Sequence, residues 1–201
     1  MSGKTHVVCG IACVLMLPCR KQGIDIIPVL FSAAVGAELP DIDTHVSSAI
    51  RWTWSLIFAF FISIGITEYY RVYSENTLIE YFKKQAEYTQ PIKYIWGVVF
   101  VILCLAGMYS KHRSFTHSFA ALLMYSYLVY QILGDYWVSF FIGYSSHLLL
   151  DVLNKKQIRL FYPVKKGLKI GICDSGGFAD AFLYAAFLMF IATRIQVLSF
   201  L

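Results

Sequence analysis

The residue pair that most clearly predicts chemistry is His147 and Asp151, four positions apart in the segment GYSSHLLLD. On an α-helix this spacing places both side chains on one face, within about 6 Å of each other. They can then bind one metal ion together, or Asp151 can orient the ring of His147 as its hydrogen-bond partner. The segment is otherwise apolar, so a solvated surface is a poor explanation. The structural alternative is an ion pair with an arginine or lysine of a neighbouring helix.

A second motif, HRSFTHS, carries His112, Arg113 and His117 within six positions. Imidazole is the commonest metal-ligand side chain, and arginine can hold a phosphate or a carboxylate through two parallel hydrogen bonds. Ser114 or Thr116 is expected to cap the following helix, which places His117 in its first turn. The structural alternative is that both histidines are ordinary polar residues with satisfied hydrogen bonds.

A third motif, LPDIDTH, places Asp41, Asp43 and His45 within five positions, directly after an apolar segment. Pro40 disfavours continuation of a helix, so the two carboxylates are expected to extend from an irregular loop. A single aspartate suffices as an N-cap, whereas two aspartates beside a histidine offer oxygen and nitrogen ligands together. His6 joins this group because the N-terminal hairpin described below returns the chain to the same side.

Mixed His and Asp ligands without thiolate favour Zn²⁺, or else Mn²⁺ or Fe²⁺, over the all-oxygen sites of Mg²⁺ and Ca²⁺. One or two ions are expected, because paired metals clamp the attacking and leaving oxygens in phosphoryl transfer. The candidate metal ligands are the imidazoles and carboxylates that these motifs bring together, namely His6, Asp41, His117, His147 and Asp151. Asp43 or His112 is the candidate general base, and Arg113 is the candidate for holding developing negative charge.

The composition indicates where such a site is built. Of 201 residues, 58% are hydrophobic and only 14% are charged, against about 25% charged in an average soluble domain. The mean hydropathy of +0.62 excludes a soluble single core and intrinsic disorder, and predicts an integral membrane protein. The net charge of +5 is spread over several loops and does not indicate nucleic-acid binding. The five cysteines form no CxxC pair, so we expect reduced, buried thiols.

Apolar stretches predict an all-α, multi-pass transmembrane helical bundle that forms a single domain over residues 1–201. About five spanning helices are expected, and their candidate ranges are 52–67, 94–110, 114–134, 136–150 and 181–193, the last extendable to 201. Gly134 and Asp135 form the whole turn between the third and fourth stretches, so these helices must be antiparallel neighbours.

Two shorter apolar segments, 5–19 and 26–37, precede these stretches. At about 1.5 Å per residue neither crosses a hydrocarbon core of about 30 Å, so we expect a hairpin that enters and returns on one side. A cleaved signal peptide is the alternative, because Lys4 precedes the first apolar run. The sequence that follows, Leu17-Pro18-Cys19-Arg20, offers no small-residue cleavage site.

Counting crossings from this hairpin places the three motifs and all five histidines at one face of the membrane. Ten of the 17 lysines and arginines gather at the same face, which the positive-inside rule makes cytoplasmic. The opposite loop, 68–93, is rich in tyrosine and mixed charges, which favours an amphipathic helix in the membrane interface.

The three motifs, with His6 and the stretch Leu160-Phe161-Tyr162-Pro163, resemble the LexA-regulated, membrane-bound metal-dependent hydrolases of the YdjM type. The resemblance covers most of the chain and implies a multi-pass inner-membrane protein with a metal-dependent hydrolase site. The residues that it places in this site are His6, Asp41, Asp43, His112, His117, His147 and Asp151. Relatives often carry Thr-Pro where this chain has Asn154-Lys155, and usually Glu at the position of Asp180. A looser similarity in the order of His and Asp is to the zinc-dependent phospholipase C family.

The function expected from these observations is hydrolysis, through a metal-activated water, of a phosphoester or related bond in a lipid or membrane-associated substrate. The partners are then the lipid bilayer and that substrate, without nucleic acid, at the inner (cytoplasmic) membrane. Lysines of the segment 155–169 would attract an anionic headgroup.

Two alternatives stay open at this point. An ion- or proton-coupled transporter would use the His/Asp cluster as a cation site, although such sites tend to lie near the bilayer midplane between inverted repeats. The third candidate is a membrane protein that a metal stabilises and that performs no turnover.

Overall fold

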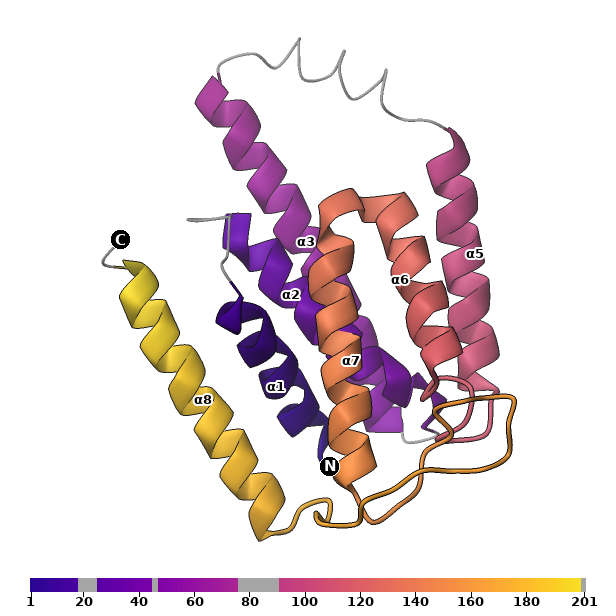
Figure 1. The fold of residues 1–201 in the computed structure, drawn as a ribbon. Coiled ribbons are helices and arrows are strands. Elements are labelled where there is room, and N and C mark those ends of the chain that lie inside the picture. The colour runs from indigo at the N-terminus through magenta and orange to yellow at the C-terminus, as the bar shows by residue number, and fades with distance from the viewer. Residues whose placement is uncertain (18–24, 45–46, 76–90, 200–201) are drawn as a thin grey trace.

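The computed structural model describes residues 1–17, 25–44, 47–75 and 91–199, and every regular element within these ranges is helical (Figure 1). The all-α fold class is therefore confirmed. His45, Cys19 and most of the expected interfacial helix in 68–93 lie outside the described residues. The cysteines in the described ranges are free thiols, of which Cys9, Cys104 and Cys173 are buried and Cys13 is half-buried.

Each apolar stretch expected from the sequence corresponds to one α-helix. The ends of these helices mostly differ by a few residues from the expected ends. Two 3₁₀ turns join them: η2, Leu39–Asp43, continues directly from α2, and η3, Gly134–Tyr136, forms the expected tight connection between α6 and α7. The α-helices are α1 (Gly3–Met16), α2 (Ile26–Glu38), α3 (Ser47–Glu75), α5 (Pro91–Met108), α6 (Phe119–Leu133), α7 (Trp137–Leu153) and α8 (Phe178–Ser199).

Among the described helices, α8 alone contains a stretch, Phe178–Gln196, that is long and apolar enough to span a membrane. Gly3–Met16, Trp52–Thr67 and Lys93–Met108 are shorter apolar stretches. The number of spanning helices therefore stays a prediction. With 15 residues, α6 is hardly longer than α1 with 14, whereas α3 with 29 and α8 with 22 residues are much longer than the hairpin helices.

Helices α1, α2 and α7 form the centre of the fold, and small residues let their backbones approach closely. A Cβ atom on Gly143 of α7 would collide with the carbonyl oxygen of Ala33, and one on Gly36 of α2 would collide with that of Phe140. On the other side, a Cβ atom on Gly10 of α1 would lie 2.8 Å from the Cβ of Ala37. Glycine at these three positions is what allows α1 and α7 to pack closely against α2.

The segments that carry the candidate site lie at one end of this bundle. Figure 1 shows the N-terminus, the end of α7 and the start of α8 together at the lower end, where the loop between α5 and α6 also lies. The expected co-location of the motifs is therefore confirmed by the arrangement of the helices.

Replacing Gly143 with alanine is expected to destabilise the fold strongly, because the new methyl group meets backbone rather than a movable side chain. The expected loss is at the upper end of overpacking effects, about 3 kcal/mol, measured by reversible unfolding in mixed detergent micelles. Gly97→Ala in α5 is the matched control, since nothing lies within 4 Å of its Cβ position. Equal stability of the two variants would contradict the close packing of α2 and α7.

Candidate metal centre

His147 is held in α7 by a hydrogen bond to the backbone of α2. Its Nδ1 lies 2.6 Å from the carbonyl oxygen of Ala37, one residue after the glycine at which the two helices approach each other. Because a carbonyl oxygen only accepts, Nδ1 carries the proton and Nε2 is left with a free lone pair. The side chain is fully buried, so this nitrogen is fixed in direction and available as a ligand.

His117 approaches the same point from the loop between α5 and α6. The expected cap at Ser114 or Thr116 is wrong: Ser118 is the N-cap of α6, and its hydroxyl accepts from the backbone N–H of Ala121 at 3.2 Å. His117 consequently lies just before the helix. The backbone here is tied to α7 by a hydrogen bond from the Tyr144 hydroxyl to the carbonyl oxygen of Thr116.

Asp43 joins this loop to the end of α2. The expected irregular loop is the 3₁₀ turn η2, because the chain continues to coil after Pro40 instead of leaving the helix. The buried Asp43 carboxylate accepts from the Thr116 hydroxyl at 2.7 Å, from the Arg113 backbone N–H at 3.0 Å and from Nδ1 of His112 at 2.7 Å. Burial alone would raise the pKa of Asp43, but these hydrogen bonds lower it to about 2.

Three nitrogen and oxygen atoms form the triangle that best fits a metal ion. The Nε2 atoms of His117 and His147 lie 3.3 Å apart, and Oδ1 of Asp41 lies 3.4 Å from the first and 3.8 Å from the second. Ligand atoms at about 2.0–2.1 Å from a tetrahedral Zn²⁺ are about 3.3–3.4 Å from one another. The triangle therefore has the size of one face of such a site.

The carboxylates around this triangle favour a positive charge within it. Burial would lower the pKa of His117, but its contacts with Asp41 and Asp43 raise it to about 9. Burial would likewise raise the pKa of Asp41, yet the surrounding imidazoles hold it below its usual value. The two carboxylates therefore stabilise a positive charge at the His117 ring, and a bound metal ion would supply such a charge.

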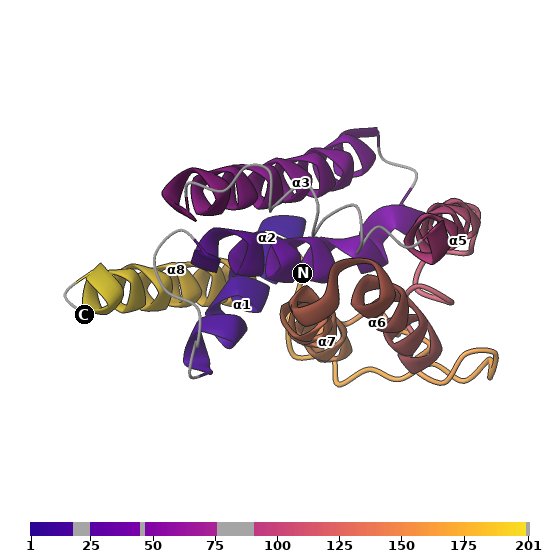
Figure 2. The same cartoon turned by 90° about the horizontal axis from the view of Figure 1, so that it is seen from above.

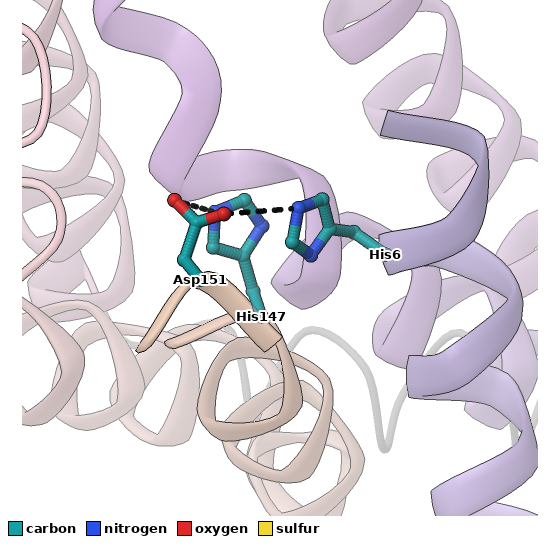
Figure 3. Close-up of side chains that lie close together, drawn as sticks. All are labelled: His6, His147 and Asp151. Carbon is teal, nitrogen blue, oxygen red and sulfur yellow. Dashed lines mark ion pairs between the residues drawn. The ribbon is translucent and has the colours of Figure 1, made fainter. Parts of the chain in front are cut away.

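Asp151 and His6 extend the cluster on the side of α1 (Figure 3). The Oδ2 atom of Asp151 lies 3.5 Å from Nε2 of His117 and 4.0 Å from Nε2 of His147, is buried, and accepts no hydrogen bond within the described part of the chain. Its Oδ1 atom lies 3.4 Å from Nε2 of His6 and 3.4 Å from the amino group of Met1. The ring of His6 stacks on that of His147, with centroids 3.8 Å apart.

Arg113 closes the cluster from the loop. Its guanidinium lies 3.2 Å from Oδ2 of Asp151 and donates to the carbonyl oxygen of Lys156 at 3.0 Å. Its φ angle of 62° lies in the left-handed region, which costs an arginine of order 1 kcal/mol or more. The hydrogen bond from its N–H to Asp43 and the ion pair with Asp151 hold the residue there.

The structure thus brings together the candidate site residues that lie in the described part of the chain; His45 of the LPDIDTH motif lies outside it. Three overlapping groups have ligand atoms within 4.8 Å of one another: His6, His147 and Asp151; Asp41, His117 and His147; and Asp41, Asp43 and His112. Four contributors were not expected as such: the carbonyl groups of Ala37 and Lys156, the amino group of Met1, and the hydroxyl of Thr116. Only Thr116 had a visible signal, since it lies inside the HRSFTHS motif.

Asp180 belongs to none of these groups. Its Oδ2 atom accepts from the backbone N–H groups of Ser2 at 3.1 Å and Gly176 at 2.8 Å. This buried carboxylate therefore joins the start of α8 to the start of α1, four residues before His6. The contribution of Asp180 is to hold the N-terminal segment in place.

The fold and this centre define a helical membrane protein with a buried cluster of His and Asp that could hold a metal ion. Comparison with protein families agrees: the model of the YdjM inner membrane protein family matches residues 1–201. The chain therefore belongs to the YdjM inner membrane protein family and is a protein of the inner membrane. No curated protein and no solved structure matches the chain.

Asp43→Asn is expected to destabilise the protein by about 3 kcal/mol. The amide removes a buried charged acceptor, and its NH₂ group would face the N–H and O–H groups that donate to the carboxylate. Thermal and denaturant unfolding in detergent measure this loss. The control is Asp174→Asn, whose carboxylate is 58% exposed in an ion pair with Lys155 and should change stability by less than about 0.5 kcal/mol. If Asp43→Asn is no less stable than this control, Asp43 does not hold the loop.

Proposed function

We propose that this protein is a metal-dependent hydrolase of the inner membrane that cleaves a phosphoester or related bond in a lipid or membrane-associated substrate. The observation that carries the proposal is the triangle of Asp41 Oδ1, His117 Nε2 and His147 Nε2, with separations of 3.3 to 3.8 Å. Three protein ligands leave one position of a tetrahedral ion open, which is the arrangement of catalytic zinc sites.

The donor set favours Zn²⁺, with Mn²⁺ as the alternative, because it combines two imidazoles with a carboxylate and contains no thiolate. When bound there, such an ion supplies a Lewis acid that polarises the scissile group and lowers the pKa of a water molecule. Backbone and side-chain partners orient the two imidazoles. The carbonyl oxygen of Ala37 accepts from Nδ1 of His147, and the Thr116 hydroxyl, which donates to Asp43 at 2.7 Å, lies 3.1 Å from Nδ1 of His117. Such outer partners fix both the tautomer and the direction of a ligating ring.

Asp151 and Arg113 supply the groups that act beside the ion. Oδ2 of Asp151 is the buried acceptor without a hydrogen bond nearest to the two imidazole nitrogens, so it can accept a proton from a water molecule as that water attacks phosphorus. The Arg113 guanidinium, in contact with the same carboxylate, is placed to hold the negative charge that develops on the phosphoryl oxygens. The role of Asp151 as a ligand, expected from the sequence, is the alternative assignment.

His112 is the group through which protons reach solvent. Its side chain is 43% exposed, its Nδ1 is held by the buried carboxylate of Asp43 at 2.7 Å, and its ring centroid lies 5.5 Å from that of His117. A carboxylate that orients an imidazole in this way is the usual support of a general acid or base. His112 can therefore give a proton to the leaving oxygen when the phosphoester bond breaks.

The position of the cluster supports an enzyme over an ion-coupled transporter. The segments that carry the cluster meet at one end of the bundle (Figure 1), whereas transporter sites tend to lie near the middle of the membrane. We further propose that α3, α5, α6, α7 and α8 span the bilayer beside the α1–α2 hairpin. The excess of lysine and arginine at the end with the site then places the site at the cytoplasmic face.

Metal analysis and an activity screen test this function together. His147→Ala is expected to lose the bound Zn²⁺ or Mn²⁺ that the wild type retains after purification in detergent, as measured by inductively coupled plasma mass spectrometry. Asp151→Asn is expected to retain the metal but to lower turnover about 10²–10⁴-fold, because the proton acceptor is gone. Turnover is followed by mass spectrometry of the products from a panel of phospholipid and lipid-linked phosphoesters.

The control in both assays is Asp174→Asn, which should match the wild type. Loss of metal from Asp151→Asn would make Asp151 a ligand and shift the proton acceptor elsewhere. A wild type that binds no metal while remaining folded would contradict the hydrolase assignment and favour the transporter alternative.

A further inference from the structure

The loop 154–177, between α7 and α8, is strongly basic. It contains one acidic residue, Asp174, and six basic residues, Lys155, Lys156, Arg159, Lys165, Lys166 and Lys169. Its formal charge of +5 (six minus one) equals the formal net charge of the entire chain, +5. Only Lys155 forms a described ion pair with Asp174, at 2.5 Å, so most of this charge is free to attract anions.

The same loop exposes large apolar side chains, which is unusual for a segment outside the helices. Leu168, Ile170 and Ile172 are 45%, 58% and 69% exposed. Their outward position is fixed by the backbone, because the N–H groups of Ile170 and Ile172 donate to the carbonyl oxygens of Val152 and Leu153 at 2.7 and 2.9 Å. The apolar side chains are therefore held at the surface by an ordered segment.

The loop also continues the apolar outer surface of α6. Phe119, Leu123 and Tyr127 follow one another at intervals of four along this helix and are all exposed. Phe161 of the loop, 60% exposed, packs its ring on that of Phe119 with centroids 5.5 Å apart. Figure 2 shows the loop reaching past α6 and α7, beyond the outline of the bundle. In an inner membrane protein, lipid surrounds that outline.

We propose that the loop 154–177 lies in the membrane interface beside the metal centre, with its aliphatic side chains among the lipids and its lysines on anionic headgroups. Apolar side chains next to lysines are the combination that binds segments to an anionic bilayer surface. The loop would thereby concentrate anionic lipid next to the site, to which it is tied by the hydrogen bond from Arg113 to Lys156. This binding does not depend on hydrolytic activity.

The test places an environment-sensitive nitrobenzoxadiazole (NBD) label on Ile170→Cys in a variant whose native cysteines are replaced by serine. The full chain is reconstituted in nanodiscs of phosphatidylcholine, with or without about 30% phosphatidylglycerol, and doxyl-labelled lipid is added as quencher. We expect blue-shifted emission and quenching at least twice as strong with phosphatidylglycerol as without it. The same label on Ser175→Cys, an exposed polar position of the same loop, should emit as in water and be quenched little.

Each other outcome overturns the proposal. A label at position 170 that emits as in water in both bilayers places the loop away from the lipid. Equal quenching with and without phosphatidylglycerol removes the role of the lysines. The third outcome is a blue shift that increases with the number of protein copies per disc and is not accompanied by doxyl quenching. It would show that a second copy of the chain, rather than lipid, covers the loop. Thermal unfolding of the labelled variants verifies their fold, and none of these readings requires turnover.

Discussion

The hydrogen bond between Nδ1 of His147 and the carbonyl oxygen of Ala37 is the interaction on which the rest of the site depends. It requires the backbones of α2 and α7 to be closer than side chains normally permit, and Gly36 and Gly143 provide that approach. The bond then fixes one imidazole tautomer and leaves Nε2 3.3 Å from Nε2 of His117 and 3.8 Å from Oδ1 of Asp41. Helix packing and ligand geometry are thus set by the same contact.

Charge balance explains why so many ionisable side chains are buried together. A buried carboxylate or imidazolium is costly unless it is paired and hydrogen-bonded. Here Asp43 collects three donors, and Asp151 lies between Arg113, His6 and the amino group of Met1. Between these two supported carboxylates, the ring nitrogens of His117 and His147 face each other at 3.3 Å. A cation is the natural partner of two such nitrogens.

Features that depend on local pattern could be predicted from the sequence. The spacing of His147 and Asp151 was sufficient to place both on one face of a helix, and Gly134 and Asp135 were sufficient to fold α7 back against α6. Thr116 shows where local reasoning fails. Its type suits an N-cap, but its hydroxyl has a stronger partner in Asp43, 73 residues away in sequence, and the capping role passes to Ser118. The hydrogen bond to the carbonyl of Ala37 could not be predicted either, because every residue has a backbone carbonyl and no side chain indicates which one is used.

X-ray absorption at the metal edge tests most directly whether the triangle holds an ion. For protein loaded with one equivalent of Zn²⁺, we predict four nitrogen or oxygen neighbours at about 2.0–2.1 Å, with the outer-shell scattering of two imidazole rings and without sulfur. His117→Ala should leave the signature of a single imidazole. A shell of water-like oxygens without imidazole scattering, or a sulfur neighbour at about 2.3 Å, would contradict a site built from Asp41, His117 and His147.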